Sequence, residues 1–186
     1  MKCLLCAKFS LKIICMHCLD CIDVNLRKRV GSDGFVVYSF FDYSNIEFLL
    51  KSKYTLIGSR IYKSLSLKAA SYMPKLDSND IYGIGIDDRA LEYYSHSGII
   101  VRCFSNIVAP LYGVFVATND VSYAGKSLEF RRQNKKHFKY SGKNNINAIL
   151  FDDVVTTGTS IDEAREVLLS NGVNVLFALV LSDARF

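Results

Sequence analysis

The segment from Ile149 to Ser160 (ILFDDVVTTGTS) constrains the possible fold of this chain more than any other stretch. It places a run of apolar residues before two adjacent aspartates and then a turn of small hydroxylated residues around one glycine. Such a run predicts a buried strand, a tight loop and the start of a helix, which is a building unit of α/β sheets. In an open α/β sheet, ligands bind beyond the carboxyl ends of the strands, so Asp152 and Asp153 are expected at a site.

The residues after the aspartates have the chemistry of a phosphate-binding loop. A helix N-terminus offers unpaired backbone N–H groups and the positive end of the helix dipole, and a glycine lets the backbone approach an anion closely. The two adjacent carboxylates can accept hydrogen bonds from the vicinal diol of a ribose. The segment therefore predicts a ribose 5-phosphate site. The alternative is helix capping, which Asp, Ser and Thr favour, but a cap needs one such residue and this segment has several.

The rest of the chain alternates between strand-like and helix-like patterns. Strands are predicted at residues 34–43, 81–86, 111–117, 148–151 and 175–181, and helices at 44–53, 59–73, 97–106 and 161–171. Residues 118–147 are polar and basic, and they predict a long functional or disordered loop. The continuous apolar character of the last strands predicts an α/β fold with a central, mostly parallel sheet flanked by helices.

The N-terminus predicts a small metal-binding module. Five of the six cysteines fall within the first 21 residues, as Cys3-x-x-Cys6 and Cys15-x-x-Cys18-x-x-Cys21. Paired spacing of this kind in a reducing compartment indicates metal rather than disulfides. Four thiolates close a tetrahedron around a structural Zn²⁺. The predicted ligands are Cys3, Cys6, Cys15 and Cys18.

Two alternatives to this ligand set remain open at the level of the sequence. Cys21 or His17 can replace one of the four ligands, and the thiols can also be free. The predicted domains are a zinc-binding Cys₄ module at residues 1–22 and an α/β domain at 23–186.

Charge and hydropathy restrict the partners and the compartment. The chain has 23 Lys and Arg against 18 Asp and Glu, a net charge of +5, with basic clusters at 27–29 and 131–137. This surplus is compatible with a polyanionic partner and equally with solvated faces. No apolar run approaches the roughly 18 residues of a membrane span, and Lys8 and Lys12 interrupt the N-terminal apolar stretch. Neither a membrane span nor a signal peptide is predicted, and a cytoplasmic location is expected.

The motifs together resemble a known family. Phe151–Ser160 (FDDVVTTGTS) resembles the phosphoribosyl pyrophosphate (PRPP) motif of type I phosphoribosyltransferases. With the cysteine ribbon, the chain resembles the ComF/ComFC competence proteins of naturally transformable bacteria. Features along the chain that agree are Phe41-Asp42-Tyr43 before a helix with Lys51 and Lys53, the Gly58 turn, and Arg131-x-x-Asn134 followed by Phe138.

The resemblance implies a type I phosphoribosyltransferase fold with Mg²⁺ bound together with PRPP. It implies that Asp152 and Asp153 are catalytic and hold the ribose hydroxyls. The residues that would hold the 5-phosphate are those of the following loop: Val154, Val155, Thr156, Thr157, Gly158, Thr159 and Ser160.

The chain departs from the family pattern at the expected pyrophosphate site. Gly85–Arg89 and Tyr94–Gly98 stand where the family usually has a Val-Pro strand end and an Arg-Gly-Phe-Asn-Gln segment, so His96 replaces a polar position there. A lone histidine is otherwise most often a structural residue. The candidates for contacts with pyrophosphate or DNA are Arg89, His96, Lys126, Arg131, Arg132 and Lys135.

Three functions follow from the resemblance. The first is a ComF-type protein of DNA uptake that binds PRPP or ribose phosphate and single-stranded DNA, with Phe130, Phe138 and Tyr140 stacking on bases among basic residues. In the alternative interpretation these aromatic residues belong to the core. The second function is a phosphoribosyltransferase of nucleotide salvage with an unknown acceptor. The third is an adaptor whose zinc ribbon docks onto a helicase or an inner-membrane DNA channel, peripherally at the inner face of the cytoplasmic membrane.

Overall fold

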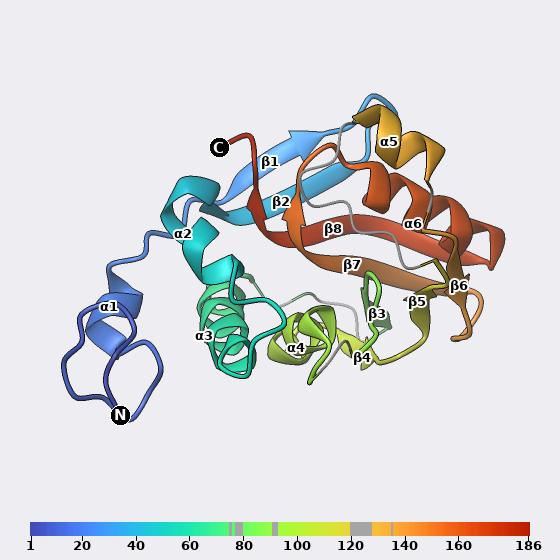
Figure 1. Ribbon diagram of the computed structural model, residues 1–186. Helices are drawn as coiled ribbons and strands as arrows, with labels where there is room; N and C mark the ends of the chain where they lie inside the picture. The colour runs from blue at the N-terminus through green and yellow to red at the C-terminus, as the bar shows by residue number, and fades with distance from the viewer. Residues whose placement is uncertain (75, 77–79, 91–92, 120–127, 135) are drawn as a thin grey trace.

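The computed structural model describes residues 1–74, 76, 80–90, 93–119, 128–134 and 136–186, with the backbone alone for residues 128, 131 and 132 (Figure 1). In chain order its elements are α1 (Met16–Asp20), β1 (Arg27–Val30), β2 (Val36–Asp42), α2 (Tyr43–Leu50), α3 (Gly58–Ser71), β3 (Ile81–Gly85), α4 (His96–Cys103), β4 (Ala109–Leu111), β5 (Phe115–Ala117), α5 (Leu128–Gln133), β6 (Phe138–Tyr140), β7 (Ile146–Val155), α6 (Thr159–Ser170) and β8 (Val173–Asp183).

Within the described residues, the main sheet has six strands in the order β1-β2-β8-β7-β3-β4. The edge strand β1 is antiparallel to β2, and every other pair in this sheet is parallel. From β3, the connection through α4 leads to β4 at one edge of the sheet, whereas from β7 the connection through α6 leads to β8 on the opposite side. The strand order therefore reverses between β3 and β7. The predicted α/β architecture, a mostly parallel sheet flanked by helices, is confirmed.

Helices cover both faces of this sheet, as its apolar strands require. Alternate residues of β7 enter different cores, because successive side chains of a strand point to opposite faces. Ile149 and Phe151 pack in the cluster that contains the buried residues of α2, α3 and α4. Ala148 and Leu150 pack in the cluster that contains α6 and the small β5–β6 sheet. The two layers are visible on either side of the strands in Figure 1.

Several predicted elements need correction. The single strand predicted at 111–117 is two strands in different sheets, because Gly113 turns the backbone in the left-handed region between them. The predicted loop at 118–147 contains α5 and β6 within its described part. The strand predicted at 148–151 extends to Val155, so Asp152 and Asp153 lie within β7 and not after it. The edge strand β1 and the short helix α1 were not predicted.

The N-terminal segment packs against the rest of the chain through apolar residues. Ile13, Ile14 and Ile22 are buried in the same cluster as α2, α3 and α4. The Lys68 ammonium of α3 donates to the carbonyl oxygen of Leu19 at 2.6 Å. The segment therefore shares its core with the sheet-bearing part. Among the described helices, none has the length and apolar character that crossing a membrane requires.

Candidate functional site

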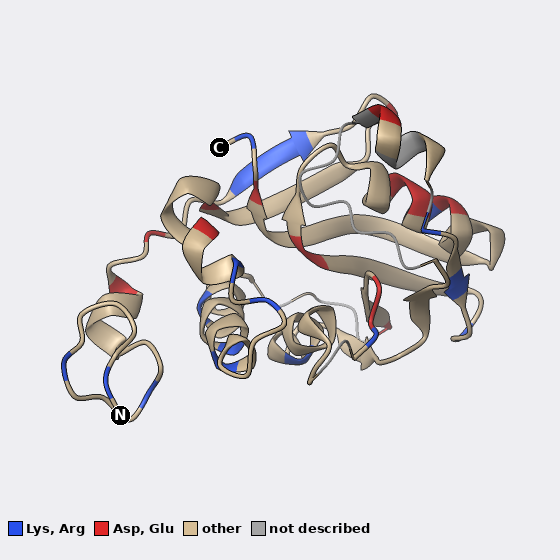
Figure 2. Cartoon of the chain, viewed as in Figure 1, with Lys and Arg blue, Asp and Glu red and all other residues tan. Residues whose placement is uncertain are grey.

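The acidic pair lies where β7 continues past the end of its neighbour. β3 ends at Gly85, which pairs with Phe151, and the N–H of Ile86 donates to the carbonyl oxygen of Phe151. On its other side, β7 stays paired with β8 as far as Val155. Asp152 and Asp153 therefore stand at the edge left open by β3, the point where the strand order reverses (red on β7 in Figure 2). Open α/β sheets bind ligands at this position.

The carboxylate of Asp153 interacts with two side chains of the protein, Lys53 and Tyr62. Its side chain is only 12% exposed, and its Oδ2 lies 2.9 Å from the Lys53 Nζ. The same oxygen accepts a hydrogen bond from the Tyr62 hydroxyl at 2.9 Å. Lys53 lies in the turn between α2 and α3, and Tyr62 is a fully buried residue of α3. A buried carboxylate needs such partners to remain ionised.

His96 completes the surroundings of the pair. It is the first residue of α4, behind the N-cap Ser95, and its Nε2 lies 3.9 Å from Asp153 Oδ1. The rings of Tyr54 and Tyr62 contact His96 edge-on, with centroids 6.3 and 6.0 Å away. Tyr54 adopts a φ of +72°, a conformation that bulky residues rarely take. The side chains of Lys53, Tyr62 and His96 thus converge on one carboxylate from three segments.

The electrostatics give the two aspartates different properties. Burial alone would raise the pKa of Asp153, but the charge of Lys53 outweighs burial and holds this pKa well below its usual range. Burial and the charge of Asp153 raise the pKa of Asp152 to about 7. Burial and the Lys53 charge lower the pKa of His96 to about 4, so this imidazole is neutral at pH 7. Asp153 is therefore the constant anion, and Asp152 exchanges a proton near neutrality.

The loop after β7 forms the start of α6 as predicted. Gly158 has a φ of +95° and is the N-cap residue of this helix. A Cβ at this position would meet no atom closer than 3.5 Å, so the backbone angle, rather than space, favours glycine. The hydroxyl oxygens of Thr157 and Thr159 lie 3.0 Å apart across the turn. The first N–H groups of a helix have no acceptor within the helix, which leaves this end suited to an anion.

Arg29 of β1 donates hydrogen bonds to the backbone of this loop. Its two terminal nitrogens donate to the carbonyl oxygens of Thr156 and Thr157, both at 2.7 Å. The side chain is 16% exposed and lies 3.5 Å from Asp183. In the same basic cluster, Arg27 pairs with Asp42 at 2.8 Å. These two arginines, along the blue strand in Figure 2, therefore have partners within the protein. Arg29 was missed as a site residue because it lies far from the motif in sequence.

Of the other predicted site residues, Arg89 has a partner within the protein, and the side chains of the rest are not described by the structure. Arg89 makes two hydrogen bonds to the Asp87 carboxylate, at 2.7 and 3.2 Å, and Asp87 has a φ of +55°. Lys126 and Lys135 lie outside the described residues, as do the side chains of Arg131 and Arg132. The roles predicted for these residues stay predictions.

The prediction that the aromatic residues near the basic cluster stack on bases is wrong for two of them. Phe138 and Tyr140 are buried, and Phe138 stacks on Phe115 with ring centroids 4.7 Å apart. Both belong to the core that contains α6. The alternative interpretation as core residues is correct here, because β6 pairs with β5 and turns both rings inward.

Two residues of the candidate site had no motif of their own. Lys53 falls in the helix expected at residues 44–53, and Tyr62 falls in the helix expected at residues 59–73. Tyr62 and Asp153 are hydrogen-bonded although they are 91 residues apart in the sequence. The sequence offers one weak signal for it, a hydroxyl-bearing ring amid apolar residues that has to find a partner when buried.

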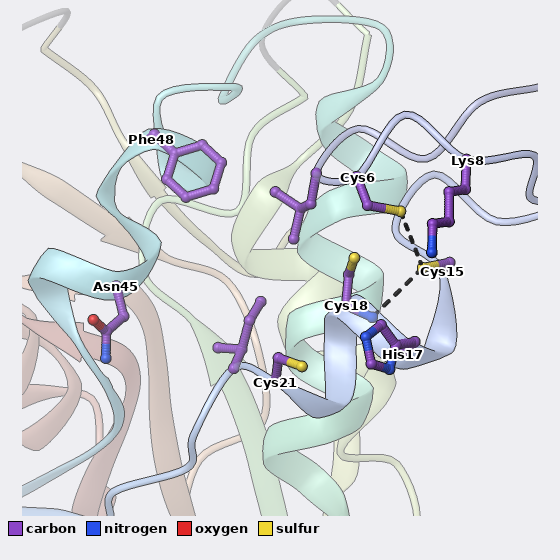
Figure 3. Close-up of a pocket in the computed structure, with 10 residues that line it drawn as sticks. Cys6, Lys8, Cys15, His17, Cys18, Cys21, Asn45 and Phe48 are labelled. Carbon is purple, nitrogen blue, oxygen red and sulfur yellow. Dashed lines mark hydrogen bonds between the residues drawn. The ribbon is translucent and has the colours of Figure 1, made fainter.

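The N-terminal cysteines form a second candidate site, and Figure 3 shows Cys6, Cys15 and Cys18 of it. Among the described residues, the ligand atoms of Cys3, Cys6, Cys15 and Cys18 lie within 4.8 Å of one another. The N–H of Cys15 points to the sulfur of Cys3 at 3.3 Å, and backbone N–H groups lower the pKa of Cys3 to about 6. Four converging thiols with N–H donors fit a structural Zn²⁺.

The same view shows where the alternative ligands lie. His17 and Cys21 line a cleft of about 500 Å³ together with Cys6, Cys15 and Cys18 of the predicted set and with Asn45 and Phe48 of α2 (Figure 3). Neither residue belongs to the group of ligand atoms within 4.8 Å of one another in the described part of the chain. The predicted set of four is therefore the one that the fold brings together.

No protein-family model and no curated protein matches the sequence. The chain is similar to solved structures at low identity. An orotate phosphoribosyltransferase from Aeropyrum pernix is 22% identical over 86% of this chain and 75% of that one, with a TM-score of 0.38. An adenine phosphoribosyltransferase is 13% identical over 89% and 88% of the two chains, with a TM-score of 0.41.

A third similar structure is the UMP synthase of Leishmania donovani, 18% identical over 89% of this chain, with a TM-score of 0.38. The present chain spans 30% of the length of that protein. The α/β fold of the chain follows from its strand order and its packing. Two of the three solved structures are named as phosphoribosyltransferases.

Proposed function

We propose that this chain binds the ribose 5-phosphate part of PRPP or of a similar sugar phosphate. The observation that carries the proposal is the acidic pair at the point of strand-order reversal, followed directly by the Gly158 turn and the N-terminus of α6. Asp152 Oδ1 accepts from the backbone N–H of Asp153 at 2.8 Å, and Asp153 Oδ2 accepts from Lys53 and Tyr62. Asp152 Oδ2 is therefore the oxygen that would accept from the sugar hydroxyls. The N–H groups and hydroxyls of Thr157, Thr159 and Ser160 hold the phosphate.

The chemistry available to such a site is displacement of pyrophosphate from C1 of PRPP. When bound with PRPP, Mg²⁺ supplies neutralisation of the leaving pyrophosphate. The chain's own contribution is to orient the sugar through Asp152 and to keep a fixed negative charge, that of Asp153, beside the ring. Arg89 and His96 are the described candidates for the pyrophosphate side.

We infer the narrower function from the combination of this site with the Cys₄ module. The proposal is a ComF-type protein of natural transformation, which holds a sugar phosphate and single-stranded DNA in the cytoplasm. Because Phe138 and Tyr140 are buried, the strand contacts rest on phosphate neutralisation by Arg131, Arg132, Lys126 and Lys135.

Two other functions have an observation in their favour. A phosphoribosyltransferase of nucleotide salvage is supported by the intact acidic pair and loop. An adaptor to a helicase or membrane DNA channel is supported by the apolar cleft between the cysteine module and α2. A zinc-binding module at residues 1–22 beside an α/β domain at 23–186 fits either of them.

The binding proposal is tested by calorimetry with ribose 5-phosphate and with PRPP. The variant Asp152→Asn with Asp153→Asn is expected to lose measurable binding of both, since the sugar hydroxyls lose their charged acceptors. Asp23→Asn, a change at an exposed aspartate away from the site, is the matched control and is expected to bind like the parent. Unchanged affinity in the double variant would sink the proposal, provided circular dichroism shows both proteins folded.

The narrower functions are separated by two further measurements. Binding to single-stranded oligonucleotides is expected to weaken with salt, and the variant Arg131→Ala with Lys135→Ala is expected to reduce the slope of that dependence. Lys139→Ala, at the exposed residue of β6, serves as control. Pyrophosphate release from PRPP in a screen of nucleobases and amines, lost in the Asp152 and Asp153 variant, would favour the transferase. Absence of any salt dependence counts against the DNA proposal.

A further inference from the structure

We propose that Arg29 is a positioning residue for anion binding, which holds the β7–α6 loop so that the N–H groups of Thr157 and Gly158 face a bound phosphate. The inference rests on the proposed function, because it concerns the loop proposed there to hold the 5-phosphate. It deepens that function by assigning the orientation of the loop to a residue 127 positions before Thr156 in the chain.

The guanidinium group of Arg29 holds two successive peptide groups. Its Nη1 donates to the carbonyl oxygen of Thr156 and its Nη2 to that of Thr157, both at 2.7 Å. The terminal nitrogens of an arginine lie in one rigid plane, so two short bonds from them fix the direction of both acceptors. The ammonium group of a lysine is a point charge on a flexible stem and lacks this fork.

The direction of these two carbonyl groups decides where the neighbouring N–H groups point. In a planar trans peptide unit, the C=O and the N–H point in opposite directions. The carbonyl of Thr156 shares its peptide unit with the N–H of Thr157, and the carbonyl of Thr157 shares its unit with the N–H of Gly158. Since both carbonyls point to Arg29, both N–H groups point away from it. Successive N–H groups on one side of a turn form a nest that binds anions.

Arg29 lies on one side of the loop and the candidate ligand site on the other. Arg29 lines a cleft of about 710 Å³ that also contains residues of the β1–β2 turn and of α6. A separate small hollow is lined by Asp152 and by residues 154–161, and Arg29 does not belong to its lining. Gly158 packs closely between the two, since a Cβ on it would lie 3.5 Å from the Arg29 Nη2. The hollow is therefore the side on which the nest meets a phosphate.

The charge of Arg29 is balanced within the protein, so orientation can be separated from general attraction of anions. The Nη1 of Arg29 and the Nη2 of Arg185 each lie 3.5 Å from the Oδ2 of Asp183, whose side chain is 1% exposed. Lys28, the preceding residue of β1, is exposed and points to the opposite face of the strand. It adds the same charge to the strand from the other face and is the natural control.

The test combines calorimetry with ribose 5-phosphate and ¹H–¹⁵N NMR of the full chain titrated with inorganic phosphate. In the parent, the Gly158 N–H resonance is expected to move downfield as phosphate binds, because an N–H bond to an anion is short and strong. Arg29→Lys and Arg29→Met are both expected to reduce this movement and to weaken ribose 5-phosphate binding about 10-fold, as for one lost hydrogen bond to a charged group. Lys28→Met is expected to stay within about 2-fold of the parent, since exposed charges are screened.

Arg29→Lys that binds like the parent overturns the inference, because charge without the fork would then suffice. A Gly158 resonance that does not respond to phosphate in the parent overturns it as well. Urea unfolding shows whether each variant is folded, and if Arg29→Met is not, Arg29→Lys decides. Equal ribose 5-phosphate binding by parent and variants removes the role of Arg29 and leaves the proposed function standing. A phosphate response that depends on Arg29, without ribose 5-phosphate binding, removes the proposed function alone.

Discussion

Asp153 and Tyr62 form a contact that ties the candidate site to the core. Tyr62 is fully buried, and its hydroxyl donates to Asp153 Oδ2 at 2.9 Å, with the carbonyl oxygen of Leu50 also within reach at 3.2 Å. With Lys53 on the same carboxylate oxygen, the charge of Asp153 is balanced inside the protein. Asp153 therefore acts as an anchor for its surroundings, and Asp152 is left to meet a ligand.

Replacing Tyr62 by phenylalanine is expected to lower the free energy of unfolding by about 2 kcal/mol at pH 7, the range for a hydrogen bond to a charged group. The lowered pKa of Asp153 gives stability that is present above the carboxyl's unfolded pKa of about 3.9 and is lost as pH falls through the folded value. The unfolded-state titration is common to the parent and the variant, so the cost of Tyr62→Phe follows protonation of Asp153 in the folded protein alone. In denaturant titrations this cost is expected to be unchanged at about pH 4 and to shrink only at more acid pH.

The matched control for this measurement is Tyr140→Phe. The Tyr140 hydroxyl donates to the carbonyl oxygen of Lys143 at 2.6 Å, an acceptor that does not titrate. Its cost is expected to stay the same between pH 7 and acid. Equal pH dependence in both variants would contradict the assignment of Asp153 as the charged partner of Tyr62.

Asp152 is expected to lower stability above neutrality. Its raised pKa of about 7 means that its contribution to stability is fully present below its unfolded pKa and is lost as pH rises through the folded value. Asp152→Asn is therefore expected to match the parent near pH 4 and to be more stable at pH 8 by at least about 1 kcal/mol. Urea unfolding at the two pH values measures this, and a variant that is less stable at pH 8 would contradict it.

At the scale of elements, the β7–α6 connection depends on one backbone conformation. Gly158→Ala is expected to cost about 1 kcal/mol, because φ of +95° strains any residue with a Cβ. It is also expected to weaken ribose 5-phosphate binding, since the relaxed loop moves its N–H groups. Gly34→Ala is the control, at φ of +82° in the β1–β2 turn with open space around it. Calorimetry that shows equal loss of binding in both variants would refute a specific role for the Gly158 turn.

The elements with strong local signals could be predicted from the sequence. The helices α3 and α6 and the strands β2, β7 and β8 follow apolar patterns bounded by turn residues, and the Gly158 turn follows from its small polar neighbours. The sequence also predicts the acidic pair at the carboxyl end of a strand, and the pair lies at an edge of the sheet. Its neighbour β3 ends there, although β7 itself continues through both aspartates.

The elements that depend on distant contacts could not be predicted. β6 has three residues in a polar stretch and is a strand because it pairs with β5. β1 carries three basic residues, and its pairing with β2 along one edge decides its conformation. In the same way, Lys53 and Arg29 reach the site through packing between segments that no local pattern links. Long-range pairing overrides local propensity in these cases.

At the scale of the whole molecule, the cysteine module and the sheet are expected to unfold together. Ile13, Ile14 and Ile22 are buried with α2, α3 and α4, so loss of the metal should remove apolar contacts from the main core. Cys3→Ser with Cys6→Ser is expected to lower the Tm of a single transition by several degrees, since each kcal/mol shifts Tm by about 2–4 °C in a chain of this size.

Differential scanning calorimetry with and without a zinc chelator checks this coupling. Cys103→Ser is the matched control, because this thiol lies on α4 outside the group of four. A separate early transition with an unchanged main one would mean that the module unfolds independently. It would then support the division at residues 22 and 23 as a true domain boundary.

The position of β8 has a consequence for how the protein is made. β8 lies between β2 and β7, yet its residues 173–183 are the last of the sheet to leave the ribosome. Until then β2 has no sheet neighbour but β1, and β7 presents an open apolar edge. Exposed edges of this kind favour aggregation during synthesis. The growing chain is therefore expected to need protection by chaperones until β8 has been made, whatever ligand the protein later binds.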